Sequence, residues 1–326
     1  MESHSFLVET EEAGLRLDSF LATQEEVVLS RTYISTLIGN GHVSVDGEEV
    51  SKPSSRLKAG QTVLLEVPDP VPVDLSPQEM DLDVAYEDEH LIVIDKPAGL
   101  VIHPSGTHHG GTLVNALLAH CGSLSGISGE LRPGIVHRLD RDTTGLMMAA
   151  KDNFTHAGLS AQLSERTVRR RYLALAWHHP EPPDGRIDAP IGRDPRNRQN
   201  MAVTRSGRRA VTNYRTLDSY RLACLLECRL ETGRTHQIRV HMARERGCPL
   251  IADERYGGMN PGGFESTKRN REMVADVLRL AGHQMLHAET LGFVHPVTGE
   301  ELEFHAAPPL EFRLVRKRLE ADRDEP

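Results

Sequence analysis

The residues best suited to chemistry lie in one polar loop, His137-Arg138-Leu139-Asp140-Arg141-Asp142-Thr143-Thr144-Gly145. Short apolar runs flank it, Ile135-Val136 before and Leu146-Met147-Met148-Ala149-Ala150 after, and they predict buried strands on both sides. Gly145 can adopt a positive φ where the loop ends. Two carboxylates and two guanidiniums held between buried strands could supply an acid, a base or a nucleophile. The alternative is a surface turn whose charges only pair with one another.

The complete string resembles the active-site motif of the RluA-type pseudouridine synthases, in which His-Arg-Leu-Asp is followed by a Thr/Ser-Gly pair. The longer run 133–151 is most similar to the RluD branch. The resemblance implies that Asp140 is the catalytic residue of an enzyme that isomerises uridine to pseudouridine.

That reaction breaks the bond between the base nitrogen and the sugar, turns the uracil and rejoins it through carbon 5. It involves no redox change and no external group, so we expect no cofactor and no metal. It does require a carboxylate near the ribose. The carboxylate acts either as a nucleophile at the anomeric carbon or as a base at the neighbouring sugar carbon, and the sequence leaves both open.

A carboxylate in a closed pocket stays ionised when a fixed cation lies nearby. The segment Thr232-Gly233-Arg234-Thr235-His236-Gln237-Ile238-Arg239-Val240-His241 also matches the family, and the resemblance implies that Arg239 pairs with Asp140. A lone arginine without this match would be interpreted as a surface or phosphate-binding residue. Tyr172, in Arg-Tyr-Leu-Ala-Leu, matches the family's tyrosine that stacks on the target base and helps to remove the proton from carbon 5. An isolated tyrosine in an apolar strand would instead be a core residue with a bonded hydroxyl.

An enzyme that acts on a uridine in structured RNA must first take the base out of its stack. The resemblance implies that Arg138 fills the vacated place or holds the flipped base, and an ion pair with Asp142 is the alternative. The other polar residues of the two motifs are expected to support the loop (His137, Thr143 and Thr144) or to contact phosphate (Arg234 and His236).

Residues 14–67 have the pattern of a small separate domain. The run from Leu15 to Leu21 suits a short helix, Ser30 can cap a second helix over Arg31–Gly39, and Asp46-Gly47 between alternating valines predicts a hairpin. This order resembles the small α/β RNA-binding domain of the ribosomal protein S-four type (the α-L motif), and an ordinary mini-domain is the alternative. The resemblance implies RNA contacts from basic side chains of this domain, among them Arg16, Arg31 and Lys52.

The proline-rich residues 68–80 predict a linker, residues 81–315 a catalytic domain, and residues 316–326 a charged C-terminal tail. Strand and helix patterns mix irregularly in the large domain, for example a helix over 153–165 and a strand or strand-to-helix segment over 238–242. There is no βαβ alternation and no glycine-rich fingerprint. We therefore expect an α+β fold around a mixed, mostly antiparallel sheet flanked by helices and loops, which is also what a pseudouridine synthase fold implies.

The net charge of −9 is unevenly distributed along the chain. Residues 151–250 hold 19 Lys and Arg against 10 Asp and Glu, so this part is locally basic although the whole chain is acidic. RNA phosphates bind to a local basic patch, and the patch therefore fits an RNA partner. A solvated charged surface without a partner is the alternative.

Composition bounds the compartment and the partners. The chain has 38% hydrophobic residues, no apolar stretch of membrane-spanning length and an acidic N-terminus, so we expect a cytoplasmic protein that binds no membrane. The four cysteines form no Cys-x-x-Cys pair, which argues against a disulfide framework or a zinc site. The expected partner is large-subunit ribosomal RNA, free or within a pre-ribosomal particle, and the expected oligomeric state is a monomer.

Three other functions remain open at this point. A non-catalytic rRNA-binding assembly factor would keep the fold as a scaffold, and a synthase of the same chemistry could act on tRNA. A glycosidic-bond hydrolase could use Asp140 and Asp142 as paired acids. The glycine-rich loop after Tyr256 and the acidic overall charge depart from the family pattern.

Overall fold

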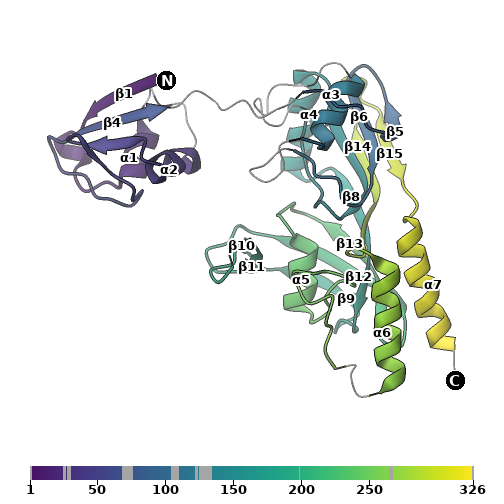
Figure 1. Cartoon of the computed structure of the whole chain (residues 1–326). Coiled ribbons are helices and arrows are strands. Elements are labelled where there is room, and N and C mark those ends of the chain that lie inside the picture. The colour runs from purple at the N-terminus through teal and green to yellow at the C-terminus, as the bar shows by residue number, and fades with distance from the viewer. Residues whose placement is uncertain are drawn as a thin grey trace. The chain divides into compact units, whose positions relative to one another are not determined.

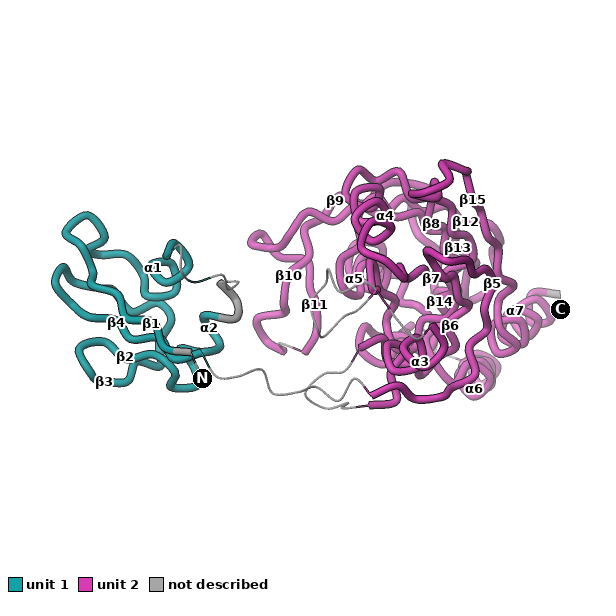
Figure 2. Tube along the Cα trace, turned by 90° about the horizontal axis from the view of Figure 1, so that it is seen from above, with its two compact units in different colours: residues 1–72 teal, residues 73–326 magenta. Residues whose placement is uncertain are grey.

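The computed structural model describes residues 2–24, 27, 31–67, 76–103, 110–121, 124, 134–197, 199–263 and 267–324. The chain divides into two compact units, Met1–Pro72 and Val73–Pro326 (Figure 2). Most of the expected linker, 68–75, lies outside the described residues. Residues 76–80 belong to the second unit, because Asn115 Nδ2 donates to the Ser76 carbonyl.

The first unit is a four-stranded antiparallel sheet in the order β1-β4-β2-β3, covered by two helices. Its elements are β1 (Glu2–Leu7), the 3-10 helix η1 (Thr10–Glu12), α1 (Leu17–Thr23), α2 (Arg31–Gly39), β2 (Val43–Val45), β3 (Glu48–Glu49) and β4 (Thr62–Val67). The expected hairpin is present, since Asp46 and Gly47 have φ of 54° and 82° as a tight turn requires. The unit reaches beyond its expected start at residue 14, because β1 pairs with β4 along its whole length.

The second unit is built on a nine-stranded sheet whose order is β5-β6-β7-β14-β8-β13-β12-β9, with β15 beside β14 (Figure 1). The strands are β5 (Asp83–Glu87), β6 (Leu91–Lys96), β7 (Thr144–Ala150), β8 (Arg169–Trp177), β9 (Asp184–Asp188), β12 (Val211–Ser219), β13 (Ala223–Leu230), β14 (Leu286–Val294) and β15 (Glu301–His305); β10 (Ile191–Arg193) and β11 (Met201–Val203) form a separate hairpin. Among these described strands only β7 and β14 pair in parallel. The α+β fold with a mixed, mostly antiparallel sheet is thus confirmed.

Helices cover both faces of this sheet. They are α3 (Leu113–Cys121), α4 (Asn153–Glu165), α5 (Gln237–Glu245), α6 (Lys268–Ala281) and α7 (Leu310–Asp324). Side chains alternate between the faces of a strand, so Tyr172 of β8 packs with α3 and α5, whereas Leu175 and Trp177 pack with α6 and α7. Leu159 of α4 belongs to a third hydrophobic cluster, together with every second residue of β6 and β7, such as Val93 and Met148. The face covered by α3 and α5 is the one that carries the pocket described below.

Two expectations are wrong. The segment 238–242 is part of helix α5, and its strand-like alternation arose because Arg239 and His241 are buried polar residues rather than solvent-facing ones. Residues 316–324 form no separate tail, since α7 runs to Asp324 and buries Leu319 against α6. Asp322 is also buried, where it accepts two hydrogen bonds from Arg221. None of the helices in the described ranges has the length and apolar character needed to span a membrane.

Candidate active site

Hydrogen bonds and close packing fix the backbone of the loop that carries Asp140 where it leads into β7. The buried Lys96 Nζ donates to the Arg141 carbonyl at 2.7 Å and also to the carbonyls of Pro97 and Leu100. Gly145 has a φ of 109°, and a Cβ there would overlap the backbone of Ala288. A glycine is therefore required where β7 meets β14.

The two threonines of the loop are anchored on β14 and the residues before it. Gln284 Nε2 donates to the Thr143 hydroxyl at 2.8 Å, and the Thr144 hydroxyl lies 2.9 Å from His287 Nδ1. Both threonines are buried. These bonds fit the expected supporting role of Thr143 and Thr144.

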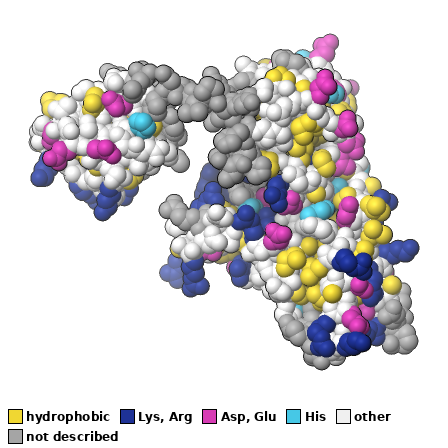
Figure 3. All heavy atoms as spheres, in the orientation of Figure 1, with side chains coloured by type: hydrophobic (Ala, Val, Ile, Leu, Met, Phe, Trp, Pro, Cys, Tyr) yellow, Lys and Arg dark blue, Asp and Glu magenta, His cyan; other side chains and the backbone are white. Residues whose placement is uncertain are grey.

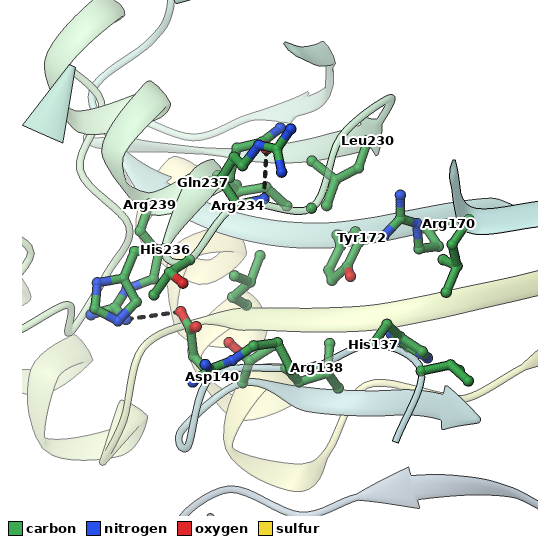
Figure 4. Close-up of a pocket in the computed structure, with 18 of the residues that line it drawn as sticks. His137, Arg138, Asp140, Arg170, Tyr172, Leu230, Arg234, His236, Gln237 and Arg239 are labelled. Atoms are coloured by element: carbon green, nitrogen blue, oxygen red, sulfur yellow. Dashed lines mark hydrogen bonds and ion pairs between the residues drawn. The ribbon is translucent and has the colours of Figure 1, made fainter. Parts of the chain in front are cut away.

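Asp140, in the loop before β7, forms the expected pair with Arg239 of helix α5. Arg239 Nη1 donates to Asp140 Oδ2 at 2.9 Å (Figure 4). The other side of the same guanidinium donates to Asp253, with Nε–Oδ2 at 2.7 Å and Nη2–Oδ1 at 2.9 Å. Asp253 is fully buried, and Arg239 is 6% exposed. One arginine thus bridges two carboxylates, of which Asp140 alone lines the pocket.

This arrangement keeps Asp140 ionised. Burial raises the pKa of its carboxyl, but two cationic groups outweigh burial and hold the pKa below the ordinary value: His236, which is charged only in the acidic range where the carboxyl titrates, and Arg239, which is always charged and also donates a hydrogen bond. Burial lowers the pKa of His236 itself to about 4, so this imidazole is neutral at pH 7. The permanent counter-charge of Asp140 is therefore the guanidinium of Arg239.

The pocket in front of Asp140 has a volume of about 520 Å³, within the range of small-ligand sites. Tyr172 lines it from β8, and its ring is almost entirely buried. Burial raises the pKa of the Tyr172 hydroxyl, Arg170 opposes this, and Asp140 adds to it. The hydroxyl is accordingly protonated at neutral pH.

The four other expected residues of the two motifs also line this pocket: His137, Arg138, Arg234 and His236. His137 Nε2 accepts a hydrogen bond from the Met148 amide at 3.1 Å, and burial lowers its pKa to about 3, as a neutral loop support requires. Arg138 is exposed at the pocket rim, and in the described part of the chain Arg141 pairs with Asp142 instead.

The side chains of Arg234 and His236 are each held by a hydrogen-bond partner. Arg234 Nε donates to the Arg209 carbonyl at 3.0 Å. His236 Nδ1 lies 2.6 Å from the Tyr256 hydroxyl, and the guanidinium of Arg239 stacks over the Tyr256 ring at 5.1 Å.

The basic residues expected to bind RNA in the first unit have different surroundings. Arg16 forms two hydrogen bonds with Asp18, at 2.9 Å each. Lys52 is exposed. The side chain of Arg31 lies outside what the structure describes.

Sequence reasoning missed Asp253 and the anchoring role of Lys96. Asp253 stands in the charged string Asp-Glu-Arg-Tyr, which has the composition of a surface loop, and Lys96 stands in a Lys-Pro-Ala-Gly turn. The sequence carries a weak signal for each: a short apolar run ends at Asp253, and a buried strand ends at Lys96. Within the described ranges, no group of three or more His, Cys, Asp or Glu side chains could hold a metal ion.

Comparison with known proteins gives one consistent result. Residues 90–244 match the family described as RNA pseudouridylate synthase, and residues 15–63 match the S4 domain. An uncharacterized RNA pseudouridine synthase of Bacillus subtilis (strain 168) is 45% identical to this chain, covering 92% of each protein. The ribosomal large subunit pseudouridine synthase D of Zymomonas mobilis is 43% identical, covering 98% of each. Among solved structures, human RNA pseudouridylate synthase domain containing 4 is similar with a TM-score of 0.55 and 26% identity, over 73% of this chain and 93% of that one.

Proposed function

This chain belongs to the RNA pseudouridine synthase family, and we propose that it isomerises specific uridines of large-subunit (23S) ribosomal RNA to pseudouridine with Asp140 as the essential catalyst. The observation that carries the proposal is the bond between Arg239 and Asp140, which holds an ionised carboxylate at the wall of a nucleotide-sized pocket. Both chemical roles of Asp140, nucleophile at the anomeric carbon and base at the neighbouring carbon, need that ionised form.

Tyr172 is proposed to lie against the uracil of the flipped uridine. Its ring forms a pocket wall, and its hydroxyl is protonated at neutral pH. Such a hydroxyl can relay the proton of carbon 5, accepting it while passing its own to a neighbouring acceptor. Arg138, exposed at the rim, is placed to replace or to hold the base that leaves the stack.

The phosphate backbone would be held by basic side chains around the pocket. Arg234 lines it, and the hairpin β10–β11 nearby adds exposed arginines; Figure 3 shows Lys and Arg side chains gathered over this part of the second unit. Exposed arginines in and beside the hairpin include Arg193, Arg196, Arg205 and Arg208. Such contacts give affinity without reading sequence. They also agree with the locally basic composition of residues 151–250.

The choice of ribosomal RNA rests on relatives of known substrate class. Proteins named ribosomal large subunit pseudouridine synthase D match almost the whole length of this chain. The match to the S4 domain adds a second RNA-binding module. We propose a cytoplasmic site of action on free rRNA or on a pre-ribosomal particle.

The geometry weakens two rival functions, a hydrolase and a non-catalytic scaffold. A hydrolase with two acids needs both carboxylates at the scissile bond. Asp142 is not among the residues that line the pocket, and it bonds Arg141 at 3.0 Å. A scaffold without catalysis would have no need for the bridged pair of Asp140 and Arg239, whose burial costs desolvation energy.

The proposal is tested with unmodified RNA and no added cofactor. Transcribed 23S rRNA, an immature large subunit and a tRNA pool are each incubated with the purified protein. Pseudouridine is then mapped by carbodiimide-dependent reverse-transcription stops. We expect discrete stops in 23S rRNA, free or in the particle. Stops found only in tRNA would show that tRNA, and not ribosomal RNA, is the substrate. RNA binding without any stop would support the non-catalytic scaffold function instead.

A further inference from the structure

Strand β8 begins with three consecutive arginines that differ in their surroundings. The guanidinium of Arg169 bonds Glu303 at 3.0 Å, and that of Arg171 bonds Glu289 at 2.7 Å. Because side chains alternate along a strand, Arg170 lies on the other face, together with Tyr172. Both Arg170 and Tyr172 line the pocket, and Figure 4 shows them side by side on β8. The middle arginine is thus the one that the fold directs toward the substrate.

Arg170 is not neutralised as its neighbours are. Its Nε is buried and has no hydrogen-bond partner among the described residues. The one carboxylate among the residues that line the pocket belongs to Asp140, which already bonds Arg239. A buried guanidinium donor without an acceptor is costly, and an anionic ligand would remove that cost.

The chain leaves room for this guanidinium. A Cβ built on Gly233 would lie 3.1 Å from Arg170 Nη1, closer than ordinary contact. Gly233 belongs to the same segment as Arg234 and Arg239, and it lines the pocket as well. The glycine of this motif therefore allows the loop to pass directly beside Arg170.

A phosphodiester group is the anion that this position fits. The planar donor face of arginine matches phosphate oxygens. If Asp140 acts on the ribose and Tyr172 contacts the uracil, the phosphates attached to that ribose are the nearest anions that the substrate brings. We propose that Arg170 binds a phosphodiester group flanking the target uridine and so seats the flipped nucleotide against Asp140. This inference rests on the proposed function and adds a ligand site to it.

The test uses two probes that differ only in phosphate, uridine and uridine 3′,5′-bisphosphate, with binding measured by titration calorimetry. We expect the wild-type protein to prefer the bisphosphate. Arg170→Met should lose that preference by about 10-fold or more, the worth of a charge-assisted hydrogen bond, and should leave uridine binding unchanged. Arg170→Lys should retain part of the preference because the charge remains.

Arg169→Met is the matched control, since its guanidinium already has a glutamate partner on the opposite face. It should keep the wild-type preference. The proposal is overturned if wild-type protein shows no preference for the bisphosphate, if Arg170→Met keeps it, or if Arg169→Met loses it equally.

Assays on RNA separate this inference from the proposed function. On a mapped RNA substrate, Arg170→Met should raise KM and reduce the slope of log affinity against log salt by about 0.7 to 0.9, as expected for one lost phosphate contact. A loss confined to kcat would mean that Arg170 acts on Tyr172 instead. If wild-type protein modifies no RNA but the bisphosphate preference depends on Arg170, the proposed function fails and the phosphate site stands.

Discussion

Replacing Asp253 by asparagine tests whether Asp253 holds Arg239 in position to pair with Asp140. The amide of Asp253→Asn keeps one acceptor oxygen, but it puts an NH₂ group against the second donor of Arg239, where the carboxylate now accepts at 2.7 and 2.9 Å. Removing one partner of a buried ion pair costs about 3 to 5 kcal/mol. The pair is more than 90% buried on both sides, so solvent offers little compensation.

Two measurable effects should follow from this substitution. The second unit should melt at a temperature lower by on the order of 10 °C. In addition, kcat should fall by about 100-fold, the effect of a displacement of about 1 Å in a catalytic group, while KM changes little.

The chain offers a clean probe and a matched control. Trp177 is the single tryptophan of the sequence and is buried in the second unit, so its fluorescence reports unfolding of that unit alone. Asp276→Asn removes exposed pairs with Arg279 on α6 and Arg318 on α7, and it should leave both the melting temperature and kcat close to the wild-type values. Wild-type kcat and melting temperature in Asp253→Asn would refute the claim that Asp253 holds Arg239 in place.

Three further outcomes are expected. Arg239→Met removes the permanent cation beside Asp140 and raises the pKa of its carboxyl, so the acid limb of the kcat/KM profile should move to higher pH; an unchanged limb would mean that another group keeps Asp140 ionised. Tyr172→Phe should lower kcat by about 10²- to 10⁴-fold with RNA binding retained, and near-normal turnover would exclude the hydroxyl from proton transfer. The pKa values of His137 and His236, about 3 and about 4, lie below the ordinary 6.5, so between pH 4 and 6.5 the unfolded chain binds more protons and stability should rise with pH, by about 1.4 kcal/mol per unit for each histidine. In a variant with both His137 and His236 replaced by Gln, the free energy of unfolding measured with urea should rise less steeply with pH than in the wild-type protein. An equal slope in the two proteins would contradict burial of these histidines as the cause.

Elements with local signals could be predicted from the sequence. The helix Asn153–Glu165 has the predicted limits, because a capping Asp152 precedes it. The hairpin at Asp46-Gly47 followed from turn chemistry alone. The pairing of Arg239 with Asp140 came from the family resemblance, since no local pattern joins residues so far apart.

The remaining features depend on contacts that only the fold makes. Helix α5 was ambiguous because its polar residues are buried by partners from elsewhere, such as Thr212 and the Ala189 carbonyl around His241. Helix α7 has a charged sequence, yet one face of it completes the core with α6. Asp253 could not be singled out because its partner Arg239 is defined by the tertiary structure, and the same holds for Lys96 and the Arg141 carbonyl.

The most direct test of the account compares wild-type protein with Asp140→Asn on the same unmodified 23S rRNA. The amide is nearly isosteric with the carboxylate but can act as neither nucleophile nor base. Pseudouridine is mapped by reverse-transcription stops, and Trp177 fluorescence confirms that the variant is folded. We expect discrete stops with wild-type protein and none with Asp140→Asn, although the variant still binds the RNA. Substantial pseudouridine formation by the folded variant would contradict it.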